Sequence, residues 1–274
     1  MKKYFFALLM LCLWACDKNK NKEVPYAASG FINQEWAMNK LWEDGQAEVA
    51  IYDAEMIIYG VARQFQNPMI TVKEEFNQAF NVKTDDYRRN DLFSVMKVNR
   101  FADIETPNYP YHYLTSLFIK RDKPEQLYKM THSGQEWCGN TFKQFELTSK
   151  GYDYDYNSYF DGYGDGKMTL SGNQSWWEDQ LPYLLRTLNF EEGLKFEKEV
   201  YVSQINTKTQ TPQKRSGQFS VIDRGDLWEV LIEFEDGKNS YLFEKEYPNV
   251  MVNQNTRYGY HMKLKRVSRY KYWR

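Results

Sequence analysis

The stretch with the most reactive side chains in this sequence is residues 132–139, which read His-Ser-Gly-Gln-Glu-Trp-Cys-Gly. A thiol at Cys138 lies near an imidazole at His132 and a carboxylate at Glu136. A thiolate activated by a base that a carboxylate orients is the arrangement of a cysteine nucleophile. The alternative is a strand in which Trp137 and Cys138 pack and the glycines allow close backbone approach. Because no known nucleophile signature surrounds Cys138, we predict no catalytic residue and keep these three as the candidates if the protein is an enzyme.

Metal and cofactor sites are also not predicted. Acidic residues alternate with tyrosines in residues 153–165, and alternating oxygen ligands suit calcium. The calcium-loop template fails, since Ser158 replaces its turn glycine and Gly164 stands where its bidentate glutamate is needed. Histidines are few and widely spaced, and Cys-x-x-Cys pairs and glycine-rich phosphate loops are absent. The histidines are His112, His132 and His261.

The C-terminal stretch is basic and aromatic, which suits contact with a polyanion. The candidates for this contact are Lys263, Lys265, Arg269 and Lys271, interleaved with Tyr270, Tyr272 and Trp273. The whole chain has 36 Lys and Arg against 37 Asp and Glu, so it lacks the basic excess of a nucleic-acid-binding protein. In an exported protein the polyanion would be an anionic lipid or glycan. The alternative is a terminal strand with a solvated basic face.

The N-terminal residues predict export and lipid attachment. Lys2 and Lys3 precede an apolar run over residues 4–14, which is too short to span a bilayer but has the length of a signal peptide. Residues 13–16, Leu-Trp-Ala-Cys, resemble a bacterial lipobox, with lipid attached to Cys16. We therefore expect a signal peptide at residues 1–15, a lipidated tether at 16–28 and a single domain at 29–274. This predicts a protein anchored to a membrane of the cell envelope, and we favour the outer membrane with the domain facing the periplasm.

The rest of the chain predicts a mainly β fold. Aromatic residues make up 17% of the sequence, and such residues favour strands. Short alternating runs separated by turn residues predict many antiparallel strands in a barrel, half-barrel or sandwich. A hairpin is expected around residues 236–239, and a polar loop over residues 203–216. The expected strands cover residues 47–52, 56–62, 69–76, 92–99, 112–120, 127–131, 141–147, 152–160, 194–204, 218–223, 228–235, 240–245 and 258–265.

Two helices should accompany these strands. Ser29 could cap a helix over residues 30–42, in which the apolar side chains recur with helical spacing. A second helix is inserted near residues 179–188, where Pro182 fits only the first turn. This helix could plug an open barrel or pack on one sheet.

Several segments together resemble a poorly characterised family of flavobacterial (Bacteroidota) lipoproteins. The most specific is the Gln-Glu-Trp-Cys-Gly run at 135–139, and the others lie at residues 42–49, 59–60, 109–111, 159–165, 181–186 and 247–248. Members often carry the label "septum formation inhibitor Maf". Maf proteins are cytosolic nucleotide pyrophosphatases with a Ser/Arg-rich phosphate-gripping motif, and this sequence has no such motif. The resemblance therefore implies a location and a fold but no activity.

These observations favour a non-enzymatic binding protein. A curved sheet presents a concave apolar face, which suits a lipid-like or other apolar ligand or an envelope partner. One alternative is an envelope enzyme that uses Cys138, His132 and Glu136. Another is a structural interaction module with a filled interior.

Overall fold

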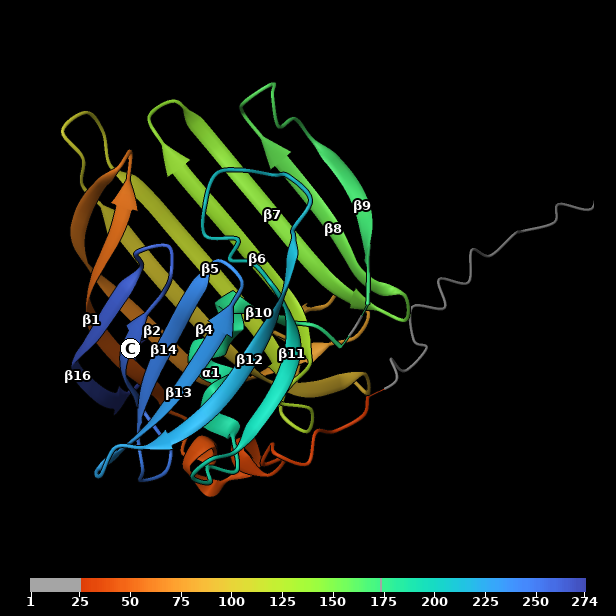
Figure 1. Cartoon of the computed structure of the whole chain (residues 1–274). Coiled ribbons are helices and arrows are strands. Elements are labelled where there is room, and N and C mark those ends of the chain that lie inside the picture. Colours follow the sequence, from red (N-terminus) through yellow and green to blue (C-terminus); the bar gives the residue numbers. More distant parts are fainter. Residues whose placement is uncertain (1–25, 173) are drawn as a thin grey trace, which may run out of the picture.

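The computed structural model describes residues 26–172 and 174–274 (Figure 1). In this part of the chain, sixteen strands form one sheet, and all neighbouring strands are antiparallel except β10 and β11. The strand order is β10-β11-β12-β13-β14-β15-β16-β1-β2-β4-β5-β6-β7-β8-β9, and β3 pairs only with β2. The last strand therefore pairs with the first, while β9 and β10 form the two ends of an open sheet.

The first nine strands form an up-and-down meander. Their bounds are β1 (Ala47–Ile58), β2 (Val61–Asn77), β3 (Val82–Lys83), β4 (Leu92–Ile104), β5 (Tyr111–Lys120), β6 (Leu127–Glu136), β7 (Gly139–Thr148), β8 (Gly151–Ser158) and β9 (Gly166–Ser171). After the helical segment the sheet continues with β10 (Trp176–Trp177), β11 (Lys195–Tyr201), β12 (Lys214–Asp223), β13 (Leu227–Phe234), β14 (Gly237–Glu244), β15 (Met251–Asn255) and β16 (His261–Tyr270).

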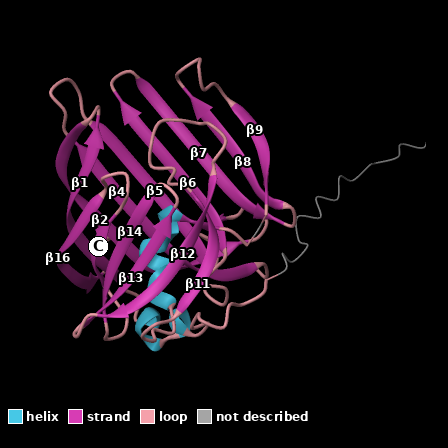
Figure 2. Cartoon of the chain, viewed as in Figure 1, coloured by secondary structure: helices cyan, strands magenta, loops and turns pink. Residues whose placement is uncertain are grey.

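The mainly β prediction and the inserted helix are confirmed. The inserted segment consists of η3 (Glu178–Gln180), α1 (Leu181–Leu184) and η4 (Leu185–Thr187), with Pro182 in its first turn as expected. Figures 1 and 2 show the sheet curled round this segment, with β11–β14 on one side and β4–β7 on the other. Of the expected architectures, the structure is thus an open barrel with a helical plug. Within the described residues, no helix is long and apolar enough to cross a membrane.

The helix predicted over residues 30–42 is wrong. The segment forms two short 3-10 helices, η1 (Trp36–Met38) and η2 (Lys40–Glu43). Between them, Asn39 has an extended backbone, and its side chain accepts a hydrogen bond from the backbone N–H of Leu41 at 2.9 Å. This local bond competes with helical pairing and ends the first turn.

Aromatic side chains fill the inside of the curled sheet. Phe145 stacks on Tyr154 with ring centroids 4.3 Å apart, and Trp177 stacks on Tyr201 at the same separation. Trp177 also lies against Phe145, and its side chain is fully buried. The concave face that the sequence suggested for a ligand is therefore covered here by the protein's own side chains.

Candidate functional site

The structure does not bring the three candidate catalytic residues together. His132 lies on the inner face of β6, fully buried, with its Nδ1 2.9 Å from the hydroxyl of Thr115. Cys138 is exposed in the turn after β6. Glu136 ends β6, and four residues of strand separate it from His132 by about 13 Å. In this arrangement His132 cannot act as the base for Cys138.

Two of the four candidate polyanion contacts, which lie on β16 or directly after it, already form ion pairs within the protein. Lys265 pairs with Asp53 at 3.2 Å. Arg269 pairs with Asp44 at 2.9 Å, and its guanidinium lies over the ring of Trp42. Two more of the predicted basic residues, Lys263 and Lys271, are exposed.

Two further predictions from the sequence concern lipid attachment and metal binding. Cys16, the expected lipidation site, lies outside residues 26–172 and 174–274. Within those ranges, no group of three His, Cys, Asp or Glu side chains could hold a metal ion.

One end of the sheet gathers aromatic side chains, of which Tyr59 and Trp137 are exposed. Because β1 to β9 run up and down, the turns after β1, β4, β6 and β8 all lie at this end, which is uppermost in Figure 1. Three of these turns and the start of β5 bring together the aromatic end, which consists of Tyr59, Tyr109, Tyr111 and Trp137.

The rings of the aromatic end contact one another in sequence. Trp137 lies 6.3 Å from Tyr109, and Tyr109 lies 5.5 Å from Tyr111, between ring centroids. The hydroxyl of Tyr59 is hydrogen-bonded to those of Tyr109, at 3.1 Å, and Tyr111. Below them, Tyr113 stands between Tyr111 and the buried ring of His132. A continuous series of ring contacts therefore links the exposed side chain of Trp137, through Tyr109, Tyr111 and Tyr113, to the buried ring of His132.

The two outermost rings are exposed far beyond what folding requires. Trp137 is 78% exposed and Tyr59 is 73% exposed. Large aromatic side chains grouped at a surface mark binding sites more often than isolated exposed ones do. Trp137 belongs to the Gln-Glu-Trp-Cys-Gly run, so the distinctive stretch of the sequence contributes to this end through its tryptophan.

The backbone of Tyr59 is strained. Tyr59 has φ of 52° and is followed by Gly60 with φ of 73°, so both residues of the turn between β1 and β2 are left-handed. Asn, Asp or Gly normally fill the first of these positions, because a larger side chain costs about 1 kcal/mol there. A tyrosine kept at this cost indicates a role for its ring.

We expect Tyr59→Asn to stabilise the fold. Asparagine adopts the left-handed conformation readily, so the free energy of unfolding should rise by roughly 0.5–1 kcal/mol. Urea unfolding followed by intrinsic fluorescence measures this change. Tyr59→Phe is the control, since it keeps the ring and the strain and loses only the hydroxyl hydrogen bonds to Tyr109 and Tyr111, so it should lower the free energy of unfolding by roughly 0.5–1.5 kcal/mol. A lower stability for Tyr59→Asn would show that the ring contributes more than the strain costs.

The hydroxyls of Tyr111 and Tyr113 remain neutral at physiological pH, because their pKa values are raised. Burial raises the pKa of Tyr111 far above its usual value, and its hydrogen bonds with Tyr109, to which it donates, and with Tyr59 raise it further. Burial also raises the pKa of Tyr113. The nearby carboxylate of Glu136 acts in the same direction on both. These two buried hydroxyls are therefore uncharged and lie near the carboxylate of Glu136.

The loop over residues 202–213, here called the crossing loop, supports the aromatic end from inside. It joins β11 to β12, and Ile205 packs in a cluster with Tyr111 and Tyr113. Thr141 on β7 donates a hydrogen bond to the carbonyl of Thr207 at 3.3 Å. The sequence predicted a polar loop here but gave no sign that it crosses the open sheet.

Buried polar groups hold the crossing loop in place. The ammonium of Lys143 donates to the carbonyls of Gln204, at 2.6 Å, and Lys208, at 3.0 Å. Asp179 accepts from the hydroxyl of Ser203, at 2.6 Å, and from the backbone N–H of Gln204, at 2.8 Å. Both charged side chains are almost completely buried. The sequence reasoning missed Lys143 and Asp179, whose roles depend on contacts distant in sequence.

No family model matches this sequence, and no curated protein matches it. Two solved structures are similar in fold. One is a β-barrel-like protein of the domain of unknown function DUF1849 from Brucella abortus, with a TM-score of 0.46 and 9% identity, covering 82% of this chain and 98% of that chain. The other is a DUF1089 family protein from Pseudomonas aeruginosa, with a TM-score of 0.40 and 12% identity, covering 67% of this chain and 89% of that chain. At these TM-scores neither identifies a function for this chain.

Proposed function

We propose that this protein is a non-enzymatic binding protein of the cell envelope, anchored by lipid on Cys16, which holds a lipid-like or other apolar ligand at its aromatic end. The observation that carries the proposal is the exposure of Trp137 and Tyr59 at the end of a continuous series of ring contacts. Aromatic rings offer large apolar contact area at low cost in side-chain entropy. The three candidate catalytic residues are too far apart to support the enzyme alternative.

The filled interior supports a ligand held at the end of the sheet. The plug residues Leu181, Leu184 and Leu185 are fully buried, as is Trp177 beside them. A ligand in the concavity would have to displace these side chains, whereas a ligand at the aromatic end would cover rings that are already exposed. Tyrosine hydroxyls there could satisfy the few polar atoms of a lipid-like molecule.

The position of the proposed lipid anchor also supports a ligand site at the aromatic end. Ser29 is hydrogen-bonded through its backbone N–H to Glu125 at 2.7 Å, and Glu125 lies in the turn between β5 and β6. That turn is at the opposite end of the strands from the aromatic end. A chain from Cys16 to residue 26 reaches at most about 35 Å. Lipid on Cys16 would therefore hold the opposite end near the membrane and leave the aromatic end directed away from it.

Trp137→Ala should weaken the binding of an apolar probe by about tenfold or more, since an exposed tryptophan in contact with a ligand is typical of binding hot spots. The probe is cis-parinaric acid, whose fluorescence rises in an apolar site. The chain from Asp17 to Arg274 is used, because it lacks both the apolar run of residues 4–14 and the acylated Cys16 and needs no detergent. At 78% exposure the indole contributes little to folding, so the unfolding midpoint should stay unchanged.

Phe80→Ala is the matched control. Phe80 is 70% exposed but follows β2 at the opposite end of the sheet. This variant should bind the probe like the parent. Equal binding by the parent and Trp137→Ala would contradict the proposal. Native mass spectrometry of the purified parent adds a direct test, because a ligand that co-purifies should be lost in Trp137→Ala.

A further inference from the structure

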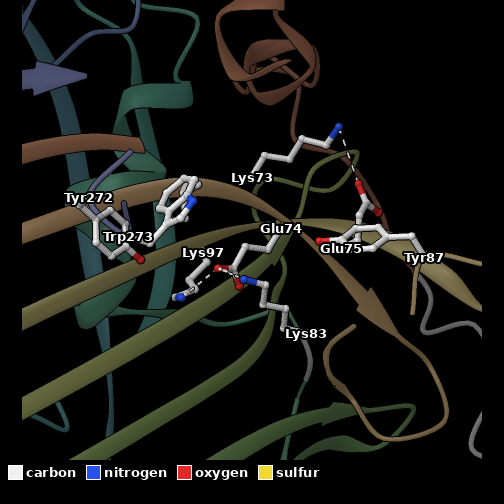
Figure 3. A pocket seen from close by; sticks show the side chains of 9 residues that line it. Lys73, Glu74, Glu75, Lys83, Tyr87, Lys97, Tyr272 and Trp273 are labelled. Atoms are coloured by element: carbon white, nitrogen blue, oxygen red, sulfur yellow. Dashed lines mark hydrogen bonds and ion pairs between the residues drawn. The ribbon is translucent and has the colours of Figure 1, made fainter. Parts of the chain in front are cut away.

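A hollow lies on the edge of β2, far from the aromatic end. β2 pairs with β1 only as far as Thr71, opposite Glu48, and pairs with β3 only from Phe76 onward. Between these points no strand among the described residues pairs with that edge. A hollow of about 560 Å³ opens there, here called the edge notch (Figure 3). This volume is ordinary for a small-molecule site.

Aromatic rings stand on both sides of the edge notch. Tyr272 and Trp273 lie on one side and Tyr87 on the other (Figure 3). Trp273 is 51% exposed and Tyr87 is 67% exposed. The rings of Tyr272 and Trp273 meet at 85° with centroids 5.0 Å apart, so one supports the other. A ligand in the notch would therefore contact flat ring faces on two sides.

The floor between these rings is charged but internally neutralised. Glu74 is 3.0 Å from the ammonium of Lys97 and 3.7 Å from that of Lys83. Lys73 pairs with Glu43 at 2.6 Å and lies 3.7 Å from Glu75. Each lysine already has a carboxylate partner, so the notch has little attraction for an ion of either sign. An apolar chain fits poorly too, because it would remove these charged groups from water.

We propose that the edge notch binds an uncharged oligosaccharide. The C–H faces of a sugar ring are apolar and weakly positive, so they stack on the negative face of an aromatic ring. The hydroxyls of the sugar both donate and accept hydrogen bonds. Carboxylates can accept several hydrogen bonds and an ammonium donates three, so the pairs around Glu74 and Lys97 keep capacity for them. This site is separate from the aromatic end and does not depend on the function assigned there.

The test is saturation-transfer NMR on the full chain with maltotriose, cellotriose, xylotriose and N,N′-diacetylchitobiose as probes. At least one should show transfer to its ring C–H protons. Trp273→Ala and Tyr87→Ala should each weaken its affinity by about tenfold, because each removes a stacking face. Tyr159→Ala, which removes a ring 68% exposed outside the notch, should stay within about twofold of the parent. Affinity should hardly change with salt, because the ligand carries no charge.

Three results would overturn the proposal. The first is no transfer to any of the four probes. The second is transfer that both Trp273→Ala and Tyr87→Ala leave unchanged. The third is that a sulfated oligosaccharide binds and the neutral ones do not, with affinity lost at high salt, which would identify a polyanion site. The cis-parinaric acid experiment with Trp137→Ala tests the aromatic end and depends on none of these three results. Either proposal can therefore be rejected without affecting the other.

Discussion

Glu48→Ala should lower the free energy of unfolding by about 3–5 kcal/mol, because it leaves the charge of Arg186 buried without its partner. Both guanidinium NH₂ groups of Arg186 donate to the carboxylate of Glu48, at 2.7 and 2.8 Å. The two side chains are 0% and 2% exposed. The pair joins η4 of the plug to β1, so its loss also loosens the plug. Urea unfolding followed by circular dichroism measures the change.

Two variants make this prediction specific. Glu233→Ala removes a carboxylate from a surface pair with Lys238, also 2.7 Å long, and should cost less than about 1 kcal/mol. Glu48→Leu combined with Arg186→Met should recover much of the stability, since no charge remains buried. If Glu48→Ala and Glu233→Ala cost the same, the plug is not held by this pair.

The sequence predicted the local elements well where apolar residues alternate. Val230, Ile232 and Phe234 on β13 face the interior as the alternation indicates. The hairpin after them forms, with its turn at residues 235–236. Pro182 correctly marked the first turn of the plug, because proline needs no N–H partner there.

Strands with polar sequences and pairings between distant segments could not be predicted in the same way. β9 and β15 are missing from the expected strands, because Gly166–Ser171 and Met251–Asn255 contain few alternating apolar residues. The pairing of β16 with β1 decides that the two halves form one curled sheet. No local pattern encodes it, since the paired residues are more than two hundred positions apart.

The candidate site was predicted only in part. The Gln-Glu-Trp-Cys-Gly run was recognised as distinctive, but for its thiol and not for Trp137. Tyr59 could have been noticed as a large residue before a turn glycine. Its hydrogen bond to Tyr109 depends on two turns meeting at one end of the sheet, which only the strand order determines.

Stability should rise with pH across the neutral range because of a buried pair of basic groups. His132 and Lys143 are partners on adjacent strands, and both side chains are fully buried. Burial lowers the pKa of Lys143 to about 7 and that of His132 well below its usual value. Asp179, Thr115 and Asn206 are polar side chains that face them, and Asp179 offsets the lowering of the pKa of Lys143 in part.

The direction of this change in the free energy of unfolding follows from the number of protons bound by the folded and the unfolded chain. Between about pH 7 and pH 10.4 the unfolded chain keeps the proton on Lys143 that the folded protein has released. Unfolding therefore takes up a proton, and the free energy of unfolding should rise by roughly 1 kcal/mol per pH unit in this range. Below about pH 6.5 the same argument applies to His132, whose folded pKa is lower still, so stability should fall on acidification.

Lys143→Met should flatten the stability profile between pH 7 and 9, and His132→Gln should flatten it below about pH 6.5. Both variants should lose some stability at every pH, since each removes a buried hydrogen-bonding group. A methionine side chain, for example, cannot donate to the carbonyls of the crossing loop that now accept from Lys143. The slope against pH, measured by urea unfolding, is therefore the decisive quantity. A slope in Lys143→Met equal to that of the parent would mean that the ammonium remains protonated within the fold. The crossing loop would then be held by a permanent buried charge, and the loss of stability on acidification would have to come from His132 alone.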